Sequence, residues 1–326
     1  MVTQQGLSTQ PKNHLLWDLF CIASLVGIWP RFIEPKLILT TRLNLKIPNL
    51  PEALQGLKVL QLSDLHLNAN MSDSYLDKLV HKSQAQEPDI IVLTGDFLCY
   101  GQLLEPARLK SLLKRFSAPY GCYAILGNHD YAQCVSINTN GDYDVIPPAT
   151  SSLGRAFSRL KDSVTLTKTI TERAKRVPLH SDLLELIAST PFKLLHNSTE
   201  VIEIKDAKLN ICGLGEHALG KLNAHEAYKN YDKNYPGLIL LHNPDGAPHL
   251  SGYPGEIILS GHTHGGQVNL PWIWKKFTLL ENMQFKKGFV KFDNRRIYIN
   301  RGIGSVLPFR WFAPPEILLL TLRSKK

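Results

Sequence analysis

The stretch that decides the fold is Leu259-Ser-Gly-His-Thr-His-Gly-Gly-Gln267, in which an apolar run ends abruptly at two histidines. Side chains alternate along an extended strand, so His262 and His264, at positions i and i+2, leave the strand end on the same side. The flanking glycines allow a tight turn and a close approach of the backbone to a ligand. Taken alone, the pair indicates either a metal site or a polar loop, and the rest of the chain decides between them.

Similar polar motifs follow other apolar runs. Residues 58–62, 89–94 and 122–126 are predicted as buried strands, and residues 75–86 and 108–116 between them have helical spacing. This alternation predicts an α/β sheet with parallel crossovers. The strands end at Asp64-Leu-His66, Gly95-Asp96 and Gly127-Asn-His-Asp130, and a later strand, 237–241, ends at His242. Turn propensity explains one such end, but several at the carboxyl edge of one sheet predict a site.

Seven side chains at these ends are oxygen or nitrogen donors, and none carries sulfur: Asp64, His66, Asp96, Asn128, His242, His262 and His264. Such a set suits Mn, Fe, Zn or Mg. Seven donors exceed what one ion with an open position needs, and an aspartate can bridge, so we expect two divalent ions about 3.5–4 Å apart that clamp a phosphate.

His129 lies outside this set and is followed by Asp130. The pair fits a catalytic histidine that is oriented by a carboxylate, and that stabilises transition-state charge or protonates the leaving oxygen. The alternative is that Asp130 only caps the turn.

In order along the chain, these motifs resemble those of the calcineurin-like metallophosphoesterases. The resemblance implies an αββα sandwich with a dinuclear centre at the strand ends and His129 as the catalytic histidine. No ligand position is missing, which argues against a metal-free scaffold. The implied ions are two divalent cations, Mn²⁺ first, with Mg²⁺, Fe and Zn²⁺ as alternatives. One ion would be held by Asp64, His66, Asp96 and His264, and the other by Asp96, Asn128, His242 and His262.

Outside the motifs, the Glu34-Pro35 strand entry and Pro314-Pro-Glu-Ile317 resemble a membrane-associated bacterial branch, and within it the UDP-2,3-diacylglucosamine pyrophosphatases of lipid A synthesis. This implies hydrolysis of a nucleotide-activated diacyl glucosamine to UMP and 2,3-diacylglucosamine 1-phosphate. It also implies a peripheral enzyme on the cytoplasmic side of the inner membrane. The alternatives are a phosphodiesterase or phosphatase acting on another lipid or envelope phosphate and, disfavoured, a nuclease.

The charge balance favours a polyanionic partner, because the 326 residues carry a net charge of +9 and the pI is near 9.2. Many basic residues gather in an insertion at about 131–192, which is either a lid over an anionic substrate or a solvated surface: Arg155, Arg159, Lys161, Lys168, Arg173, Lys175 and Arg176. No segment resembles a nucleic-acid module, so we expect no nucleic-acid partner. No obligate protein partner is inferred.

Five cysteines without a CxxC pair indicate reduced thiols, not a disulfide framework.

An apolar segment near the N-terminus runs from Leu15 to Trp29 and is followed by Pro30. As a helix it would be about 22 Å long, short of the ~30 Å hydrocarbon core, and it contains Asp18. We therefore expect no membrane span, and no secretory signal, because a basic n-region and a cleavage site are missing. Two interpretations stay open: an interfacial helix with Trp17 and Trp29 at its ends, or a helix packed on the domain.

The expected division is a tail and membrane-association segment over residues 1–34 and one domain over 35–326. Two segments that join aromatic and basic residues, 271–277 and 308–312, fit either a lipid interface or buried core. Two acyl chains would need an apolar groove near the metals, which we expect in the insertion.

Overall fold

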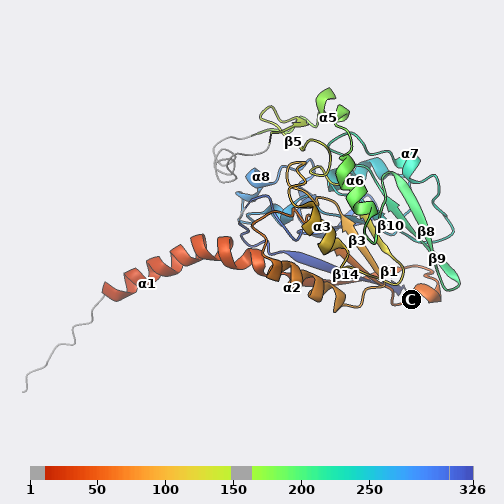
Figure 1. The fold of residues 1–326 in the computed structure, drawn as a ribbon, viewed down its shortest axis with the longest axis horizontal. Coiled ribbons are helices and arrows are strands. Elements are labelled where there is room, and N and C mark those ends of the chain that lie inside the picture. Colours follow the sequence, from red (N-terminus) through yellow and green to blue (C-terminus); the bar gives the residue numbers. More distant parts are fainter. Residues whose placement is uncertain (1–11, 148–163, 308, 326) are drawn as a thin grey trace, which may run out of the picture.

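Two six-stranded sheets form the centre of the protein (Figure 1). The computed structural model describes residues 12–147, 164–307 and 309–325. The first sheet has the order β1 (Leu39–Ile47), β14 (Glu316–Ser324), β2 (Lys58–Leu62), β3 (Ile90–Thr94), β4 (Cys122–Ile125) and β7 (Phe192–Leu194). The second has the order β12 (Gly288–Phe292), β13 (Arg295–Ile299), β11 (Ile257–Ser260), β10 (Gly237–Leu240), β9 (Ala207–Gly213) and β8 (Ser198–Ile204).

Parallel pairing dominates the middle of both sheets. β2, β3, β4 and β7 are parallel in the first sheet, and β9, β10, β11 and β13 are parallel in the second. Strand β14, from the end of the chain, inserts between β1 and β2 and runs antiparallel to β2, with Leu319 opposite Leu60. The parallel strands therefore deliver their carboxyl ends to one edge, as predicted from the sequence.

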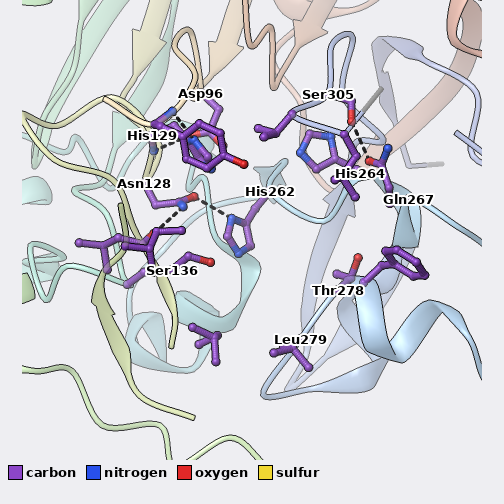
Figure 2. A pocket seen from close by; sticks show the side chains of 18 of the residues that line it. Asp96, Asn128, His129, Ser136, His262, His264, Gln267, Thr278, Leu279 and Ser305 are labelled. Atoms are coloured by element: carbon purple, nitrogen blue, oxygen red, sulfur yellow. Dashed lines mark hydrogen bonds between the residues drawn. The ribbon is translucent and has the colours of Figure 1, made fainter. Parts of the chain in front are cut away.

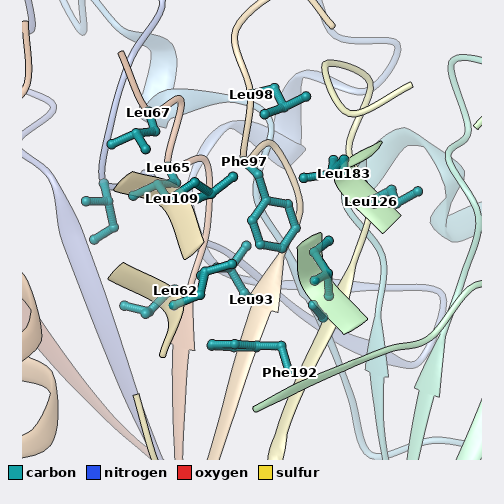
Figure 3. Packing of buried hydrophobic residues seen from close by; sticks show 14 of the residues in the cluster. Leu62, Leu65, Leu67, Leu93, Phe97, Leu98, Leu109, Leu126, Leu183 and Phe192 are labelled. Carbon is teal, nitrogen blue, oxygen red and sulfur yellow. The ribbon is translucent and has the colours of Figure 1, made fainter. Parts of the chain in front are cut away.

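The continuous apolar runs of the central strands are explained by burial on both faces. Along β3, Ile90 and Val92 pack between the two sheets, whereas Ile91 and Leu93 pack under the helices on the outer face of the first sheet. Figure 3 shows this outer layer, in which Phe97, Leu109 and Leu183 meet. A third apolar cluster covers the outer face of the second sheet. The layers form the αββα sandwich that the sequence predicted.

Helices cover both outer faces. Over the first sheet lie α2 (Asp73–Gln84), α3 (Pro106–Leu113), α5 (Glu172–Arg176) and α6 (Ser181–Ala188), and over the second lie α7 (Ala224–Ala227), η4 (Pro244–Leu250) and η6 (Met283–Lys286). The other short helices are η3 (Glu52–Leu54), whose Leu54 packs between the sheets, α8 (Trp274–Phe277), and η5 (His264–Gly266) at the donors. Helix α6 is capped by the side chain of a histidine. Nδ1 of His180, one residue before Ser181, accepts the N–H of Leu183 at 3.4 Å. The insertion contains a short hairpin, β5 (Val135–Ile137) with β6 (Tyr143–Val145).

The N-terminal helix projects away from the sandwich (Figure 1). It runs without a break through α1 (Lys12–Ala23), η1 (Ser24–Ile33) and η2 (Glu34–Lys36), so the prediction that Pro30 closes it was wrong. Proline clashes with the carbonyl four residues earlier, and the turns of η1 widen to i→i+5, as in the bond from the N–H of Glu34 to the carbonyl of Trp29. Residues 14–36 are long and apolar enough to cross a membrane, by length and composition alone.

Candidate metal centre

The polar residues that follow the strands converge at one edge of the sandwich. Ligand atoms within 4.8 Å of one another form three groups: Asp64 with His66 and His264, His66 with Asp96 and His129, and Asp96 with His242 and His262. Figure 2 shows Asp96, Asn128, His262 and His264 around the cavity at this edge. The structure thus brings all seven predicted donors together.

Asp96 lies where two half-sites meet. Its Oδ2 is 3.3 Å from Nε2 of His66 and 3.2 Å from Nε2 of His242. On one side, Nε2 of His264 lies 3.2 Å from Nε2 of His66 and 3.7 Å from Oδ1 of Asp64. On the other side, Oδ1 of Asn128 lies 3.3 Å from Nε2 of His242 and 2.9 Å from Nδ1 of His262. This arrangement has one shared carboxylate between two donor sets.

Backbone carbonyls orient three of the donors. Nδ1–H of His66 donates to the carbonyl of Leu98 at 2.8 Å, and Nδ1–H of His242 donates to that of Thr94 at 2.7 Å, which leaves both Nε2 lone pairs free. The Asn128 amide nitrogen donates to the carbonyl of Val135 at 2.7 Å, so its oxygen faces the centre. These partners could not be predicted from the sequence, because a carbonyl can belong to any residue type.

The backbone is strained at the donors. Five of the seven have a positive φ: Asp64 (50°), His66 (43°), Asp96 (58°), His262 (70°) and His264 (50°). Residues other than glycine rarely adopt this region, and such strain clusters at functional sites. At two motif positions only glycine fits, because a Cβ atom would clash with its neighbours. A Cβ on Gly127 would lie 2.3 Å from Oδ1 of Asp96, and one on Gly261 would lie 1.9 Å from Oγ of Ser63.

The electrostatics favour bound cations. Burial lowers the pKa of His262 to about 3 and also lowers that of His264, so both rings are neutral donors. Burial would raise the pKa of Asp96, but His242, His129 and His66 together bring it well below its usual value. In addition, the facing ring nitrogens of His66 and His264 repel each other unless a proton or a cation lies between them. The donor set therefore fits divalent ions.

His129 is oriented differently from the prediction. Its Nδ1 accepts the backbone N–H of Tyr100 at 2.9 Å, which places the proton of the neutral ring on Nε2. The carboxylate of Asp130 instead accepts the backbone N–H groups of Asp96 (2.7 Å), Gly127 (2.9 Å) and Leu98 (3.0 Å). The hypothesis that Asp130 orients His129 was wrong because these amides take up its oxygens. Asp130 holds the loops of the site in place, as in the turn-capping alternative.

Two adjoining cavities lie over the centre. The smaller, about 120 Å³, is lined by four of the donors, Asp96, Asn128, His262 and His264, and by His129. The larger, about 990 Å³, lies between the insertion and residues 272–283, and both are lined by Ile137, Ile146 and Leu279. The expected apolar groove is therefore built only in part by the insertion. Of its basic residues, Lys168 lines the larger cavity, Arg173, Lys175 and Arg176 are exposed on α5, and Arg155, Arg159 and Lys161 lie outside the described residues.

Residues 57–266 match the family model described as calcineurin-like phosphoesterase. The match covers more than half of the chain and spans every predicted donor. The chain belongs to the calcineurin-like phosphoesterase family. Members of this family use divalent metals, in agreement with the donor groups of this phosphoesterase.

Curated relatives extend the similarity over nearly the whole phosphoesterase. UDP-2,3-diacylglucosamine pyrophosphatase LpxG of Chlamydia muridarum is 38% identical over 307 residues, which cover 91% of this chain and 92% of that protein. The protein of the same name from Chlamydia trachomatis is also 38% identical, with the same coverage. Phosphodiesterase YaeI of Escherichia coli is 25% identical over 81% of this chain and 82% of that one.

Proposed function

We propose that this phosphoesterase hydrolyses the diphosphate bond of UDP-2,3-diacylglucosamine, as implied by its similarity to the two chlamydial pyrophosphatases over nine-tenths of both lengths. Water adds to one phosphorus, the bridging P–O bond breaks, and the products are UMP and 2,3-diacylglucosamine 1-phosphate. The observation that carries the proposal is this full-length similarity, together with a complete donor set at the strand ends.

The proposed ligands of one ion are Asp64, His66, Asp96 and His264, and those of the other are Asp96, Asn128, His242 and His262. We propose Mn²⁺ as the native ion, with Mg²⁺, Fe and Zn²⁺ as alternatives. When bound, two such cations neutralise phosphate charge and lower the pKa of the attacking water. Within the chain, His129 lines the cavity with a protonated Nε2, so it donates a hydrogen bond to a phosphate oxygen and stabilises the transition-state charge.

The larger cavity supports a lipid substrate. It adjoins the metal cavity, so a diphosphate held at the donors leaves its acylated sugar beside the groove. Apolar side chains line much of it, among them Val145, Pro147, Leu166, Trp272 and Met283. An acyl chain in this groove would be removed from water, which is the main source of affinity for an apolar ligand.

The proposed location is the cytoplasmic side of the inner membrane, with residues 1–34 as the membrane-association segment and 35–326 as the catalytic domain. The helix over 12–36 carries exposed apolar side chains such as Leu16 and Phe20. Asp18 would cost about 2.5–3.5 kcal/mol at the centre of a bilayer, which favours peripheral attachment. Alkaline carbonate should release the protein from membranes, and retention in the pellet would mean that the helix spans.

A substrate panel tests the activity. With Mn²⁺, the purified protein should release UMP from UDP-2,3-diacylglucosamine faster than it cleaves a glycerophospholipid, and it should leave single-stranded DNA intact. Cleavage of phosphodiesters without UMP release would support the second candidate, a phosphodiesterase, which the similarity to YaeI favours. Binding to DNA or RNA that is strong and salt-sensitive would point to the nuclease alternative.

A further inference from the structure

All five tryptophans of the chain lie in three segments that are far apart in the sequence: Trp17 and Trp29 on the N-terminal helix, Trp272 and Trp274 at α8, and Trp311. Tryptophan is the residue most enriched where proteins meet the water–lipid boundary. Trp272 is 83% exposed and Trp17 is 63% exposed, so two of the five are mostly uncovered by the described part of the protein.

Backbone hydrogen bonds hold these three segments side by side. The N–H of Arg310 donates to the carbonyl of Pro30 at 2.8 Å, and the N–H of Phe312 donates to Oε2 of Glu34 at 3.0 Å. On its other side, this segment pairs with the chain that leads to α8. The N–H of Asn269 donates to the carbonyl of Trp311 at 2.7 Å, and its side chain donates to the carbonyl of Phe312 at 2.9 Å.

The result is one continuous surface, which we call the contact face: the helix over residues 14–33, residues 269–276 and Phe312. Many of its exposed side chains are apolar or aromatic, including Leu16, Phe20, Trp272 and Phe312. In Figure 1, α8 lies on the side of the sandwich from which the helix projects. An apolar surface of this extent on a water-soluble domain marks a contact with a partner or a membrane.

Charge on the contact face favours an anionic partner. Lys275 and Lys276 follow Trp274, and residues 269–276 and 309–313 contain no acidic residue. Nζ of Lys286 lies 4.0 Å from the centre of the Trp274 ring, and the guanidinium of Arg31 lies 5.3 Å from the centre of the Phe32 ring. Asp18 is the one acidic residue of the helix over 14–33, against Arg31 on the same helix. Glu34, at the C-terminal end of the helix, is 2% exposed and so adds little negative charge to the surface. Aromatic rings with lysines beside them are typical of segments that lie at the headgroup level of a bilayer.

The groove adjoins this face. Trp272, Lys275 and Met283 line the larger cavity, and the same cavity adjoins the metal centre through Ile137 and Leu279. A path from the contact face to the donors is therefore bordered by residues that suit lipid at one end and phosphate at the other.

We propose that the contact face docks on an anionic phospholipid bilayer, with Trp272 and Lys275 as a second anchor beside the N-terminal helix, so that the groove opens onto lipid. The helix alone would tether the domain in any orientation, whereas two anchors fix one orientation. A lipid substrate then reaches the metal centre without leaving the membrane surface. This inference rests on the proposed function only for the identity of that lipid.

Fluorescence quenching tests the docking without any substrate. The full chain is reconstituted in phosphatidylcholine and phosphatidylglycerol vesicles that contain lipid brominated near the headgroup. Trp272→Phe should lower the fraction of tryptophan emission that the brominated lipid quenches. Leu104→Trp, at an exposed site before α3, should add emission that is not quenched. An equal quenched fraction in wild type and Trp272→Phe, or quenching of the emission added in Leu104→Trp, would overturn the proposal.

Vesicle binding gives an independent check. Without substrate, Lys275→Glu should weaken the binding of the full chain to anionic vesicles by about fivefold or more. Lys229→Glu, an exposed charge reversal just after α7, is the matched control and should bind as the wild type does. Equal effects of the two reversals on vesicle binding would overturn the docking. Failure of the wild type to cleave the nucleotide lipid would refute the proposed function, and the quenching result would still decide the docking.

Discussion

The backbone N–H of Tyr100 donates to Nδ1 of His129 across 2.9 Å. This bond leaves the proton of the neutral imidazole on Nε2, where the ring faces the cavity. Replacement of His129 by Ala should therefore lower kcat by about 10²–10⁴-fold without loss of metal. Metal analysis of the purified variant should give the wild-type content, and loss of both ions would contradict a role confined to stabilising the transition state.

Asp96→Ala, unlike His129→Ala, should lose metal as well as activity. One oxygen of Asp96 lies within 3.3 Å of ring nitrogens from both half-sites, so its removal should abolish turnover together with metal binding. Titration with Mn²⁺, followed by calorimetry, measures the second effect directly. Equal metal loss in Asp96→Ala and His129→Ala would refute the assignment of different roles to the two residues.

Asp130→Asn should destabilise the fold. The buried carboxylate accepts three backbone N–H groups, and an amide places donors against them, at a cost of about 2 kcal/mol or more. We expect the Tm to fall by several degrees. Asp206→Asn, at an exposed turn between β8 and β9, is the matched control and should leave the Tm unchanged. Similar Tm values for the two variants would contradict the structural role of Asp130.

The ion pair between His217 and Glu281, 3.0 Å apart, should make stability depend on pH. Burial alone would lower the pKa of His217, but the hydrogen bond to Glu281 and nearby carboxylates raise it above 6.5. Burial would raise the pKa of Glu281, but the hydrogen bond from His217 and its charge bring it below 4.5. Because Glu281 also accepts the hydroxyl of Tyr143 at 3.0 Å, the pair ties the insertion to the core.

The direction of the pH dependence follows from the linkage between protonation and folding. The His217 contribution is fully present below pH 6.5 and is lost as pH rises through the raised pKa. The Glu281 contribution is present above pH 4.5 and is lost as pH falls through the lowered pKa. Stabilisation by the pair should therefore be greatest between about pH 4.5 and 6.5. Thermal unfolding of wild type and Glu281→Gln at pH values below, within and above this range measures it, and a constant difference in Tm at every pH would contradict the ion pair.

Removal of residues 1–28 should separate membrane attachment from catalysis. The truncation keeps the foot of the helix, where the indole of Trp29 donates to Glu34 at 2.7 Å. We expect the protein to move from the membrane to the soluble fraction and to keep its activity on a soluble phosphodiester. Unchanged membrane retention would assign the attachment to the aromatic segments near α8 and Trp311.

Much of the fold could be predicted because the central strands are apolar on both faces. Strand β2 has the predicted bounds, 58–62. Each motif that follows a parallel strand contributes side chains to the site. Strand β12, which was not predicted, lies at a sheet edge and is only half buried, so its pattern is weak. The hairpin of β5 and β6 was also missed, because strands of three residues carry too little periodicity.

Tertiary contacts decided the remaining differences. Two partners of Asp130, Asp96 and Leu98, lie in the loop after β3 and meet it only in the folded chain, whereas adjacency in sequence had favoured His129. Pro30 predicted a helix end, but the fold accommodates it with widened turns and with the contact from Arg310 to its carbonyl. Neither contact has a local sequence signal.

The most direct test of the account is ³¹P NMR of the products formed from UDP-2,3-diacylglucosamine with Mn²⁺ in ¹⁸O-labelled water. The account predicts equal amounts of UMP and 2,3-diacylglucosamine 1-phosphate, with a single ¹⁸O on phosphorus in one of the two products, and no reaction by Asp96→Ala. Formation of UDP and free diacylglucosamine, or no reaction while a simple phosphodiester is cleaved, would contradict it.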